Sequence, residues 1–458
     1  MLTDTIAAVG TALSNSGISI IRISGEKSLN IINKVFKTNS EIEPNTIVYG
    51  KIINNGNFID DVLVSYFKAP KSFTGEDICE INCHGGNKIT KNILEIVLEN
   101  GARLATPGEF SKRAFLNGKM DLSQAEATIN LINAKTDTEL RVATNQKEGI
   151  ISNEIDKLRN VLIELLAQIE VSVDYPEYDY EEIDNNNLFK ILDEEIKQIN
   201  KIINTYDQGR YIKDGINVSI LGKPNVGKSS LLNNLANYEK AIVTDIPGTT
   251  RDIVEETINL GDIVLNLSDT AGIRDTDDII EKIGVDKSLK ILDETDLVIY
   301  MINANSIIDD EDKNIISKIQ NKGLKFITVI NKIDQVEKLI FDVFLEELKQ
   351  IKVDNPIFLS VKDNHNIDNL KNRIKELFLN NDFDYEHELI ITSIRHKDIL
   401  KRSVDNLYKA KNEIEIGQPI DIVSIYVKDA ANLLGEIIGS NVSEDVISKI
   451  FEKFCLGK

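Results

Sequence analysis

The sequence is poor in cysteine, in basic residues and in long apolar runs. Three cysteines cannot all pair, so no disulfide framework is expected and a reducing cytoplasm is the predicted location. No apolar stretch is long enough to cross a bilayer. The N-terminal MLTDTIAAVG lacks the basic region of a secretion signal and the arginine-rich character of a mitochondrial one, so neither is expected.

The charge balance is strongly acidic. Lysine and arginine number 53 against 74 aspartates and glutamates, which gives a net charge of −21. This balance favours solubility and opposes long-range attraction to a phosphate backbone. If the protein handles a nucleic acid, a local basic patch must do so, and no long lysine or arginine run marks one.

The chain has 458 residues, enough for two to three domains, and its patterns divide it into four segments. Residues 1–118 mix alternating strands such as GISIIRISG with helices, and residues 119–212 and 379–458 have helical apolar spacing. Residues 213–378 alternate strand and helix, which predicts a parallel sheet with helices on both faces. The simplest architecture is this α/β domain inserted into a helical domain, behind an N-terminal α+β domain.

A phosphate-binding loop follows the first strand of the α/β segment. GKPNVGKSS, residues 222–230, matches G-x-x-x-x-G-K-[ST] between a strand and a helix, the context that the motif requires. Loop N–H groups would wrap the phosphates, Lys228 would reach the β and γ phosphates, and Ser229 would bind Mg²⁺. A chance glycine loop is the alternative.

Two later motifs identify guanine. DTAG, residues 269–272, should face the γ-phosphate, and NKID, residues 331–334, follows another predicted strand. The Asp334 carboxylate can accept two hydrogen bonds from guanine, whereas adenine offers no such donor pair. SVK, residues 360–362, stands where GTPases commonly carry S-A-K. Motifs in this order predict a GTPase.

The usual water-orienting glutamine is missing, because Ile273 directly follows DTAG. Another group must therefore orient the water and neutralise the transition-state charge. The amide oxygen of Asn225 and the oxygen-rich loop TDIPGTTRD, residues 244–252, could hold a K⁺ ion there. Alternatively, Asn225 only stabilises the P-loop.

Several stretches together resemble the MnmE (TrmE) family of tRNA-modification GTPases, of the TrmE-Era-EngA-like group. GKPNVGKSS, TDIPGTTRD, DTAGIRD and NKID match its GTPase domain. SFTGEDICEINCHGG, TPGEFSKRAFLNGKMDLSQAEA and the terminal FCLGK match its other parts and are more specific. The resemblance covers essentially the whole chain. It implies a homodimer that works with tRNA and with a flavoprotein, MnmG (GidA), which brings FAD.

The family's nucleotide site carries over by position. It implies that K⁺ is held by Asn225, Thr244, Ile246 and Thr249, the middle two through main-chain oxygens. Mg²⁺ would be held by Ser229 and Thr250, and Glu281 would orient the water, although spacing alone does not choose Glu281 over Asp278. The expected GTP-binding residues are Asn225, Val226, Gly227, Lys228, Ser229, Ser230, Thr244, Asp245, Ile246, Pro247, Gly248, Thr249, Thr250, Asp269, Thr270, Ala271, Gly272, Asn331, Lys332, Asp334, Ser360, Val361 and Lys362.

The resemblance also implies a folate site in the N-terminal domain. The family binds a tetrahydrofolate derivative, in a 5-formyl or methylene form, and the matching residues are Arg22, Glu80, Lys119 and Lys458. Folate has a glutamate tail that favours cations and a pterin edge that favours a carboxylate. From the residues alone, each of the four would more often be surface charge.

The sequence leaves the role of the cysteines undecided at two places, in CEINCH and near the C-terminus. CEINCH, with Cys79, Cys83 and His84, suggests a metal site, but the cysteines lie four apart on a predicted strand with no second pair nearby. Cys455 is four residues from the end, yet CLGK lacks the pattern of a prenylation site. The resemblance favours a catalytic role for Cys455, and a packing thiol is the alternative.

The resemblance implies GTP hydrolysis coupled to an aminomethyl or carboxymethylaminomethyl modification at C5 of the tRNA wobble uridine. The alternatives are a GTP-timed ribosome assembly factor, which needs neither the folate stretch nor FCLGK, and a folate enzyme with a structural GTPase domain. Complete GTPase motifs weigh against the latter.

Overall fold

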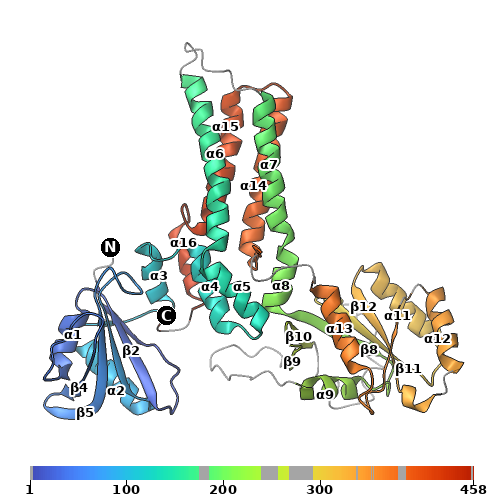
Figure 1. Ribbon diagram of the computed structural model, residues 1–458, viewed down its shortest axis with the longest axis horizontal. Helices are drawn as coiled ribbons and strands as arrows, with labels where there is room; N and C mark the ends of the chain where they lie inside the picture. Colours follow the sequence, from blue (N-terminus) through green and yellow to red (C-terminus); the bar gives the residue numbers. More distant parts are fainter. Residues whose placement is uncertain are drawn as a thin grey trace. The chain divides into compact units, whose positions relative to one another are not determined.

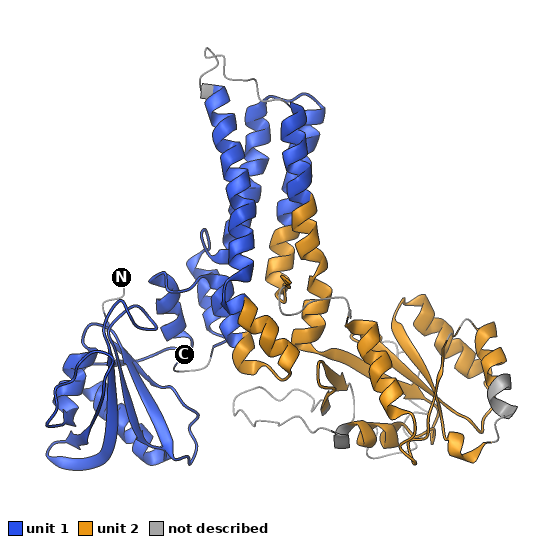
Figure 2. Cartoon of the chain, in the orientation of Figure 1, with its two compact units in different colours: residues 1–129, 146–196, 402–458 blue, residues 130–145, 197–401 orange. Residues whose placement is uncertain are grey.

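The computed structural model describes residues 4–174, 185–238, 256–267, 292–336, 339–351, 353, 355–379, 388–454 and 457. The chain forms two compact units, drawn in blue and orange in Figure 2. The first comprises residues 1–129, 146–196 and 402–458, and the second comprises residues 130–145 and 197–401. No helix among the described residues is both long and apolar enough to cross a bilayer.

The N-terminal part of the first unit is a seven-stranded sheet in the order β3-β4-β5-β6-β2-β1-β7. Its neighbours pair antiparallel except β1 with β7, which are parallel. The strands are β1 (Ile6–Val9), β2 (Ile18–Ser24), β3 (Phe36–Lys37), β4 (Ile47–Asn54), β5 (Asn57–Phe67), β6 (Ile78–His84) and β7 (Arg103–Leu104). The strands predicted from alternating patterns are therefore confirmed.

Helices α1 (Ser28–Val35) and α2 (Asn87–Glu99) cover one face of this sheet. Their apolar residues recur every three or four positions and join one core with the inward residues of the strands. Helix α2 stops just before Gly101, whose φ of +116° is in the region that glycine adopts most easily. Helix α3 (Glu109–Leu116) follows β7.

The rest of the first unit is helical, as predicted. Helices α6 and α15 pack against each other along the bundle (Figure 1). The first unit contains α6 (Ile150–Asp174), α15 (Ile420–Ile438) and α16 (Glu444–Phe451). Helix α8 (Tyr206–Asp214) and most of α5 (Asp137–Lys147) belong to the second unit, and α4 (Leu122–Asn133), α7 (Asn185–Asn204) and α14 (Ile394–Glu415) are divided between the two.

The second unit contains a six-stranded sheet in the order β13-β12-β11-β8-β10-β9. Its strands are β8 (Ile216–Gly222), β9 (Glu256–Asn259), β10 (Val264–Leu267), β11 (Leu297–Asn303), β12 (Lys325–Asn331) and β13 (Ile357–Phe358). Five strands are parallel, but β9 pairs antiparallel with β10. The predicted parallel sheet is therefore confirmed for these five strands, and β9 is an additional antiparallel edge strand. Strand β9 is short and its pairing comes from a tight hairpin at the sheet edge, which the alternation of strands and helices does not reveal.

Helices lie on both faces of this sheet, as predicted (Figure 1). One core contains residues of α9 (Lys228–Tyr238) and α13 (Ile367–Phe378), and the other contains residues of α11 (Asp310–Asn321) and α12 (Leu339–Gln350). Along β11, Leu297 and Ile299 enter the first core while Val298 and Tyr300 enter the second. Both faces are thus buried, which explains the continuous apolar run of β11.

Candidate functional site: the P-loop and the surface around Arg22

The P-loop connects β8 to α9, the strand–loop–helix context that its motif requires. The Lys228 ammonium donates to the main-chain oxygens of Gly222, at 2.8 Å, and Lys223, at 2.9 Å. It therefore lies within the curve of the loop. Ser229 and Ser230 stand exposed in the first turn of α9, where the helix N-terminus favours an anion.

Asn331, at the end of β12, ties the P-loop to the loop of Val361. Its buried amide nitrogen donates to the Val226 main-chain oxygen at 2.8 Å, and its Oδ1 accepts from the Val361 N–H at 3.2 Å. Gly227 has φ +102°, and a Cβ there would lie 2.4 Å from the Asn331 amide nitrogen. Only glycine permits this approach. Three motifs far apart in sequence therefore share one site.

The residues predicted to recognise the base lie at the same end of the sheet. Lys332 donates to the main-chain oxygen of Asn225 at 2.6 Å. The exposed carboxylate of Asp334 accepts from the Ser360 hydroxyl at 2.8 Å, which orients it. Lys362 is exposed beside the buried Val361. The structure thus brings together the predicted phosphate and base residues that it describes.

Other predicted nucleotide residues lie outside the described residues. These are residues 244–250, residues 269–272 and Glu281, together with Asp278 and Ile273. Of the four predicted K⁺ ligands the structure describes Asn225, and of the two Mg²⁺ ligands it describes Ser229. Asn225 has φ +61°, a left-handed conformation that asparagine tolerates better than most residues.

Arg22 and Glu80 face each other across β2 and β6. The Arg22 Nε donates to a Glu80 carboxylate oxygen at 2.8 Å, and about a quarter of the Arg22 side chain is exposed. The Arg22 guanidinium lies 5.7 Å from the centre of the Phe73 ring and 5.8 Å from that of Phe110. These two aromatic residues were not predicted, although Phe110 lies within the family-specific stretch TPGEFSKRAF.

Lys119 belongs to the same part of the unit. Its ammonium donates to the main-chain oxygen of Pro70 at 3.0 Å, and its side chain lies against Gly75. Phe73 lies in the loop between Pro70 and Gly75. The three described folate candidates therefore gather around one loop, which neither strand pairing nor local sequence spacing would reveal.

The C-terminal segment reaches Arg22. An Arg22 Nη1 donates to the main-chain oxygen of Gly457 at 3.3 Å. Gly457 has φ +92°, and a Cβ there would lie 2.1 Å from the main-chain oxygen of Val9. Cys455 and Lys458 lie outside the described residues.

Cys79 and Cys83 are buried in the core beneath the first sheet. Burial raises the pKa of Cys79 to about 12 and also raises that of Cys83. His84 turns to Asp60, with Nδ1 2.7 Å from a carboxylate oxygen. Within the described part of the chain, no three His, Cys, Asp or Glu residues are placed to hold a metal ion.

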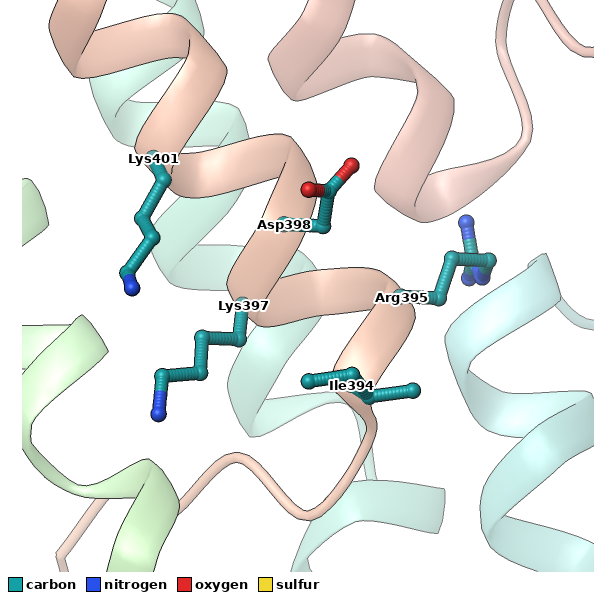
Figure 3. Close-up of a pocket in the computed structure, with 5 residues that line it drawn as sticks. All are labelled: Ile394, Arg395, Lys397, Asp398 and Lys401. Carbon is teal, nitrogen blue, oxygen red and sulfur yellow. The ribbon is translucent and has the colours of Figure 1, made fainter.

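A surface pocket of about 410 Å³ lies at the start of α14 (Figure 3). The residues that line it are Ile394, Arg395, Lys397, Asp398 and Lys401. Figure 3 shows Lys397 and Lys401 pointing to one side of the helix and Arg395 to the other. Lys397 is also engaged by Asp207 at 3.0 Å. Because the cations do not converge, the pocket is not built for a single anion.

Two family models match the chain. The model for the MnmE helical domain matches residues 122–455, and the model for the GTP-binding protein TrmE N-terminus matches residues 5–119. A curated relative, the tRNA modification GTPase MnmE of Acetivibrio thermocellus, is 49% identical over 99% of this chain and 99% of its own length. The chain belongs to the MnmE family.

Two further MnmE relatives are similar over the same extent. The tRNA modification GTPase MnmE of Finegoldia magna is 44% identical over 99% of this chain and 100% of its own length. That of Oceanobacillus iheyensis is 43% identical over 100% of this chain and 99% of its own. The MnmE resemblance therefore includes the N-terminal sheet and the helices as well as the nucleotide motifs, and the predicted family is confirmed.

Proposed function

We propose that this MnmE-family chain hydrolyses GTP and couples the hydrolysis to tRNA modification. The observation that carries the proposal is Asn331, which holds the phosphate loop and the base-recognition loop together. Lys228 binds the β and γ phosphates, and Asp334 accepts hydrogen bonds from guanine. Ser229 and Thr250 would hold Mg²⁺. Mg²⁺ supplies charge neutralisation at the phosphates.

The RNA substrate follows from the relatives, whose name is tRNA modification GTPase. The chain then acts as a homodimer with the flavoprotein MnmG, and FAD is held by MnmG. The modified position is C5 of the wobble uridine, which receives an aminomethyl or carboxymethylaminomethyl group.

Nucleoside analysis of tRNA tests this function. Cells that lack the protein should lose the wobble modification, and a plasmid copy of the wild-type chain should restore it. A copy with Lys228→Ala should fail to restore it, because phosphate binding is lost. Unchanged wobble uridines with defective ribosomal subunits would instead favour the ribosome assembly factor.

A K⁺ ion is proposed to replace the missing catalytic group. Asn225 stands exposed in the P-loop, and among the described residues its side-chain amide has no hydrogen-bond partner. Its oxygen is therefore available for a hard cation, with Thr244, Ile246 and Thr249 as the other ligands. A K⁺ ion held by these residues would favour contact between the two GTPase domains of the dimer, and Glu281 would orient the attacking water.

The cation is tested by GTP turnover in K⁺ and in Na⁺ at equal ionic strength. Turnover should be faster in K⁺, and Asn225→Ala should abolish the difference while GTP binding largely survives. Equal wild-type rates in the two salts would eliminate the K⁺ site. GTP titration of the same samples separates lost binding from lost hydrolysis.

A tetrahydrofolate is proposed for the surface around Arg22. The described donor set fits this group: Glu80 offers a carboxylate to a pterin edge, Phe73 offers a 40% exposed ring, and Arg22 and Lys119 offer cations to a glutamate tail. Lys458 would add a fourth polar group. The bound folate supplies a one-carbon unit, and Cys455 acts in the modification step.

Binding of 5-formyltetrahydrofolate, measured by calorimetry, tests this site without an activity assay. Arg22→Ala should weaken binding at least about tenfold, since a charge-assisted hydrogen bond contributes roughly 1.5–3 kcal/mol. Lys51→Ala, a change on the same sheet at an exposed residue, is the control and should bind normally. Equal affinities for the wild-type protein, Arg22→Ala and Lys51→Ala would show that Arg22 does not bind the folate.

A further inference from the structure

Lys223 of the P-loop has a structural partner that its motif does not specify. It stands in an unspecified position of G-x-x-x-x-G-K-[ST], directly after the last residue of β8. Its ammonium donates to Asp309 Oδ2 at 2.6 Å and to Asp312 Oδ2 at 2.7 Å. The loop is thereby attached to the N-terminus of α11, 86 residues away along the chain.

The two acceptors are themselves held in place. Asp309 is the N-cap of α11, and its Oδ1 accepts from the N–H groups of Glu311 and Asp312, both at 3.1 Å. Asp312 Oδ2 accepts in return from the Asp309 N–H at 3.2 Å, which completes a capping box. The hydroxyl of the fully buried Tyr300 donates to Asp312 Oδ1 at 2.6 Å. The Asp309 and Asp312 carboxylates are therefore held by groups of both β11 and α11.

Charge favours this arrangement. The Asp312 side chain is 3% exposed, so a buried carboxylate without a cation would be costly, and Lys223 supplies that cation. Hydrogen bonding from Lys223 lowers the pKa of Asp309 to about 2. Burial acts to lower the pKa of Lys223, but its two carboxylate partners outweigh that effect and raise it. Asp309 and Lys223 therefore remain charged at neutral pH.

The attachment bears directly on the phosphate-binding lysine. The main-chain oxygen of Lys223 accepts from the Lys228 ammonium at 2.9 Å. A displacement of residue 223 therefore moves one of the two main-chain partners that hold Lys228. The opposite side of the loop is held independently, through Asn331 at Val226 and Lys332 at Asn225.

We propose that Lys223 is a positioning residue, which fastens the P-loop to α11 and so sets where Lys228 meets the phosphates. The inference rests on the proposed GTP function of the same loop. It differs from a purely stabilising ion pair, because it predicts a loss of affinity that depends on the phosphates of the nucleotide. A stabilising pair would alter unfolding and leave nucleotide preference unchanged.

The test compares Lys223→Met with a matched control in the full-length protein. Lys375→Met is the control, since Lys375 is 30% exposed and pairs with Asp262 at 2.8 Å, against 29% exposure for Lys223. Affinities for fluorescent GDP are titrated directly, and affinity for GMP is measured by competition. Lys223→Met should weaken GDP binding about tenfold and GMP binding much less. Lys375→Met should change neither.

Two more variants keep the test decisive. Lys223→Arg should bind GDP with near-wild-type affinity, because a guanidinium group can donate to both carboxylates. Asp309→Asn retains a good N-cap residue but weakens the ion pair with Lys223. Adding Lys223→Met to Asp309→Asn should therefore reduce GDP affinity by a smaller factor than Lys223→Met reduces it in the wild-type protein. If Lys223→Met does not fold, Asp309→Asn alone should weaken GDP binding more than GMP binding, and Lys223→Arg should change neither.

The inference is overturned if Lys223→Met binds GDP within twofold of wild type, or if GMP and GDP affinities fall equally. Additive effects of Asp309→Asn and Lys223→Met on GDP affinity would overturn it as well. Failure of the wild-type chain to bind GDP would instead refute the proposed function, so the two failures are distinguishable.

Discussion

Replacing Gly457 by alanine should release the C-terminal segment from the N-terminal sheet. The new Cβ would lie 2.1 Å from the main-chain oxygen of Val9, 2.9 Å from its carbonyl carbon and 3.2 Å from the Cα of Gly10. These are main-chain atoms at the end of β1, so no side-chain rotation can relieve the overlap. Relief therefore requires residue 457 to move away from β1.

The magnitude follows from two contributions. An alanine held at the φ of +92° that Gly457 adopts costs about 1–2 kcal/mol. The overlap with the main chain of Val9 adds to this cost in the docked state, whereas the 3.3 Å hydrogen bond from Arg22 stabilises docking in both proteins. Docking should therefore weaken by about 2 kcal/mol or more, which corresponds to about 30-fold.

Carboxypeptidase digestion of the native protein, followed by mass spectrometry, measures this release. When opening is fast, the rate of cleavage tracks the undocked population, so Gly457→Ala should be trimmed at least about tenfold faster. Its thermal midpoint should stay near wild type, because only the chain end is affected. GTP turnover should persist, while tRNA modification with MnmG falls.

Gly417→Ala is the matched control. Gly417 has φ +72°, and a Cβ there would meet nothing within 4 Å. Gly417 lies between α14 and α15, so this variant carries a similar backbone strain away from Gly457 and should be digested at the wild-type rate. If Gly457→Ala is also trimmed at the wild-type rate, the tail accommodates a Cβ and the reasoning fails. If both variants are trimmed faster, the release does not depend on the contact with Val9, and the reasoning fails as well.

Three other expectations concern charged groups. Burial raises the pKa of Glu139 to about 7 from 4.5, so its ionisation opposes folding, and stability should fall by on the order of 3 kcal/mol as pH rises from about 4.5 to above 7. Glu139→Gln should flatten this fall in urea unfolding curves recorded by circular dichroism. Arg113 is 1% exposed and donates to Asp4, Glu76 and Glu109. Arg113→Met should therefore lower the free energy of unfolding by about 3–5 kcal/mol at neutral pH, and a loss under about 1 kcal/mol would contradict this. Glu281→Ala should reduce kcat for GTP about a hundredfold with little change in GTP affinity, whereas near-normal kcat would transfer the role to Asp278 or another group.

Local pattern was sufficient for much of this protein. The P-loop could be read directly, because its backbone N–H groups meet phosphates within one short stretch between a strand and a helix. The end of α2 before Gly101 was equally local, since it depends on the conformational freedom of one residue. Alternation along β4 is also local, since successive side chains of a strand face opposite sides, and Val48 and Ile52 are buried.

Only the tertiary structure could join segments that are distant in sequence. The antiparallel pairing of β9, the contact between Arg22 and Gly457, and the attachment of Lys223 to Asp312 all depend on which elements pack side by side. A charged side chain in a single sequence has many possible partners, and nothing in its neighbours selects one. Lys223 looked like an unspecified loop residue because Asp312 becomes its partner only after β8, β11 and α11 are assembled and water is excluded from the carboxylate.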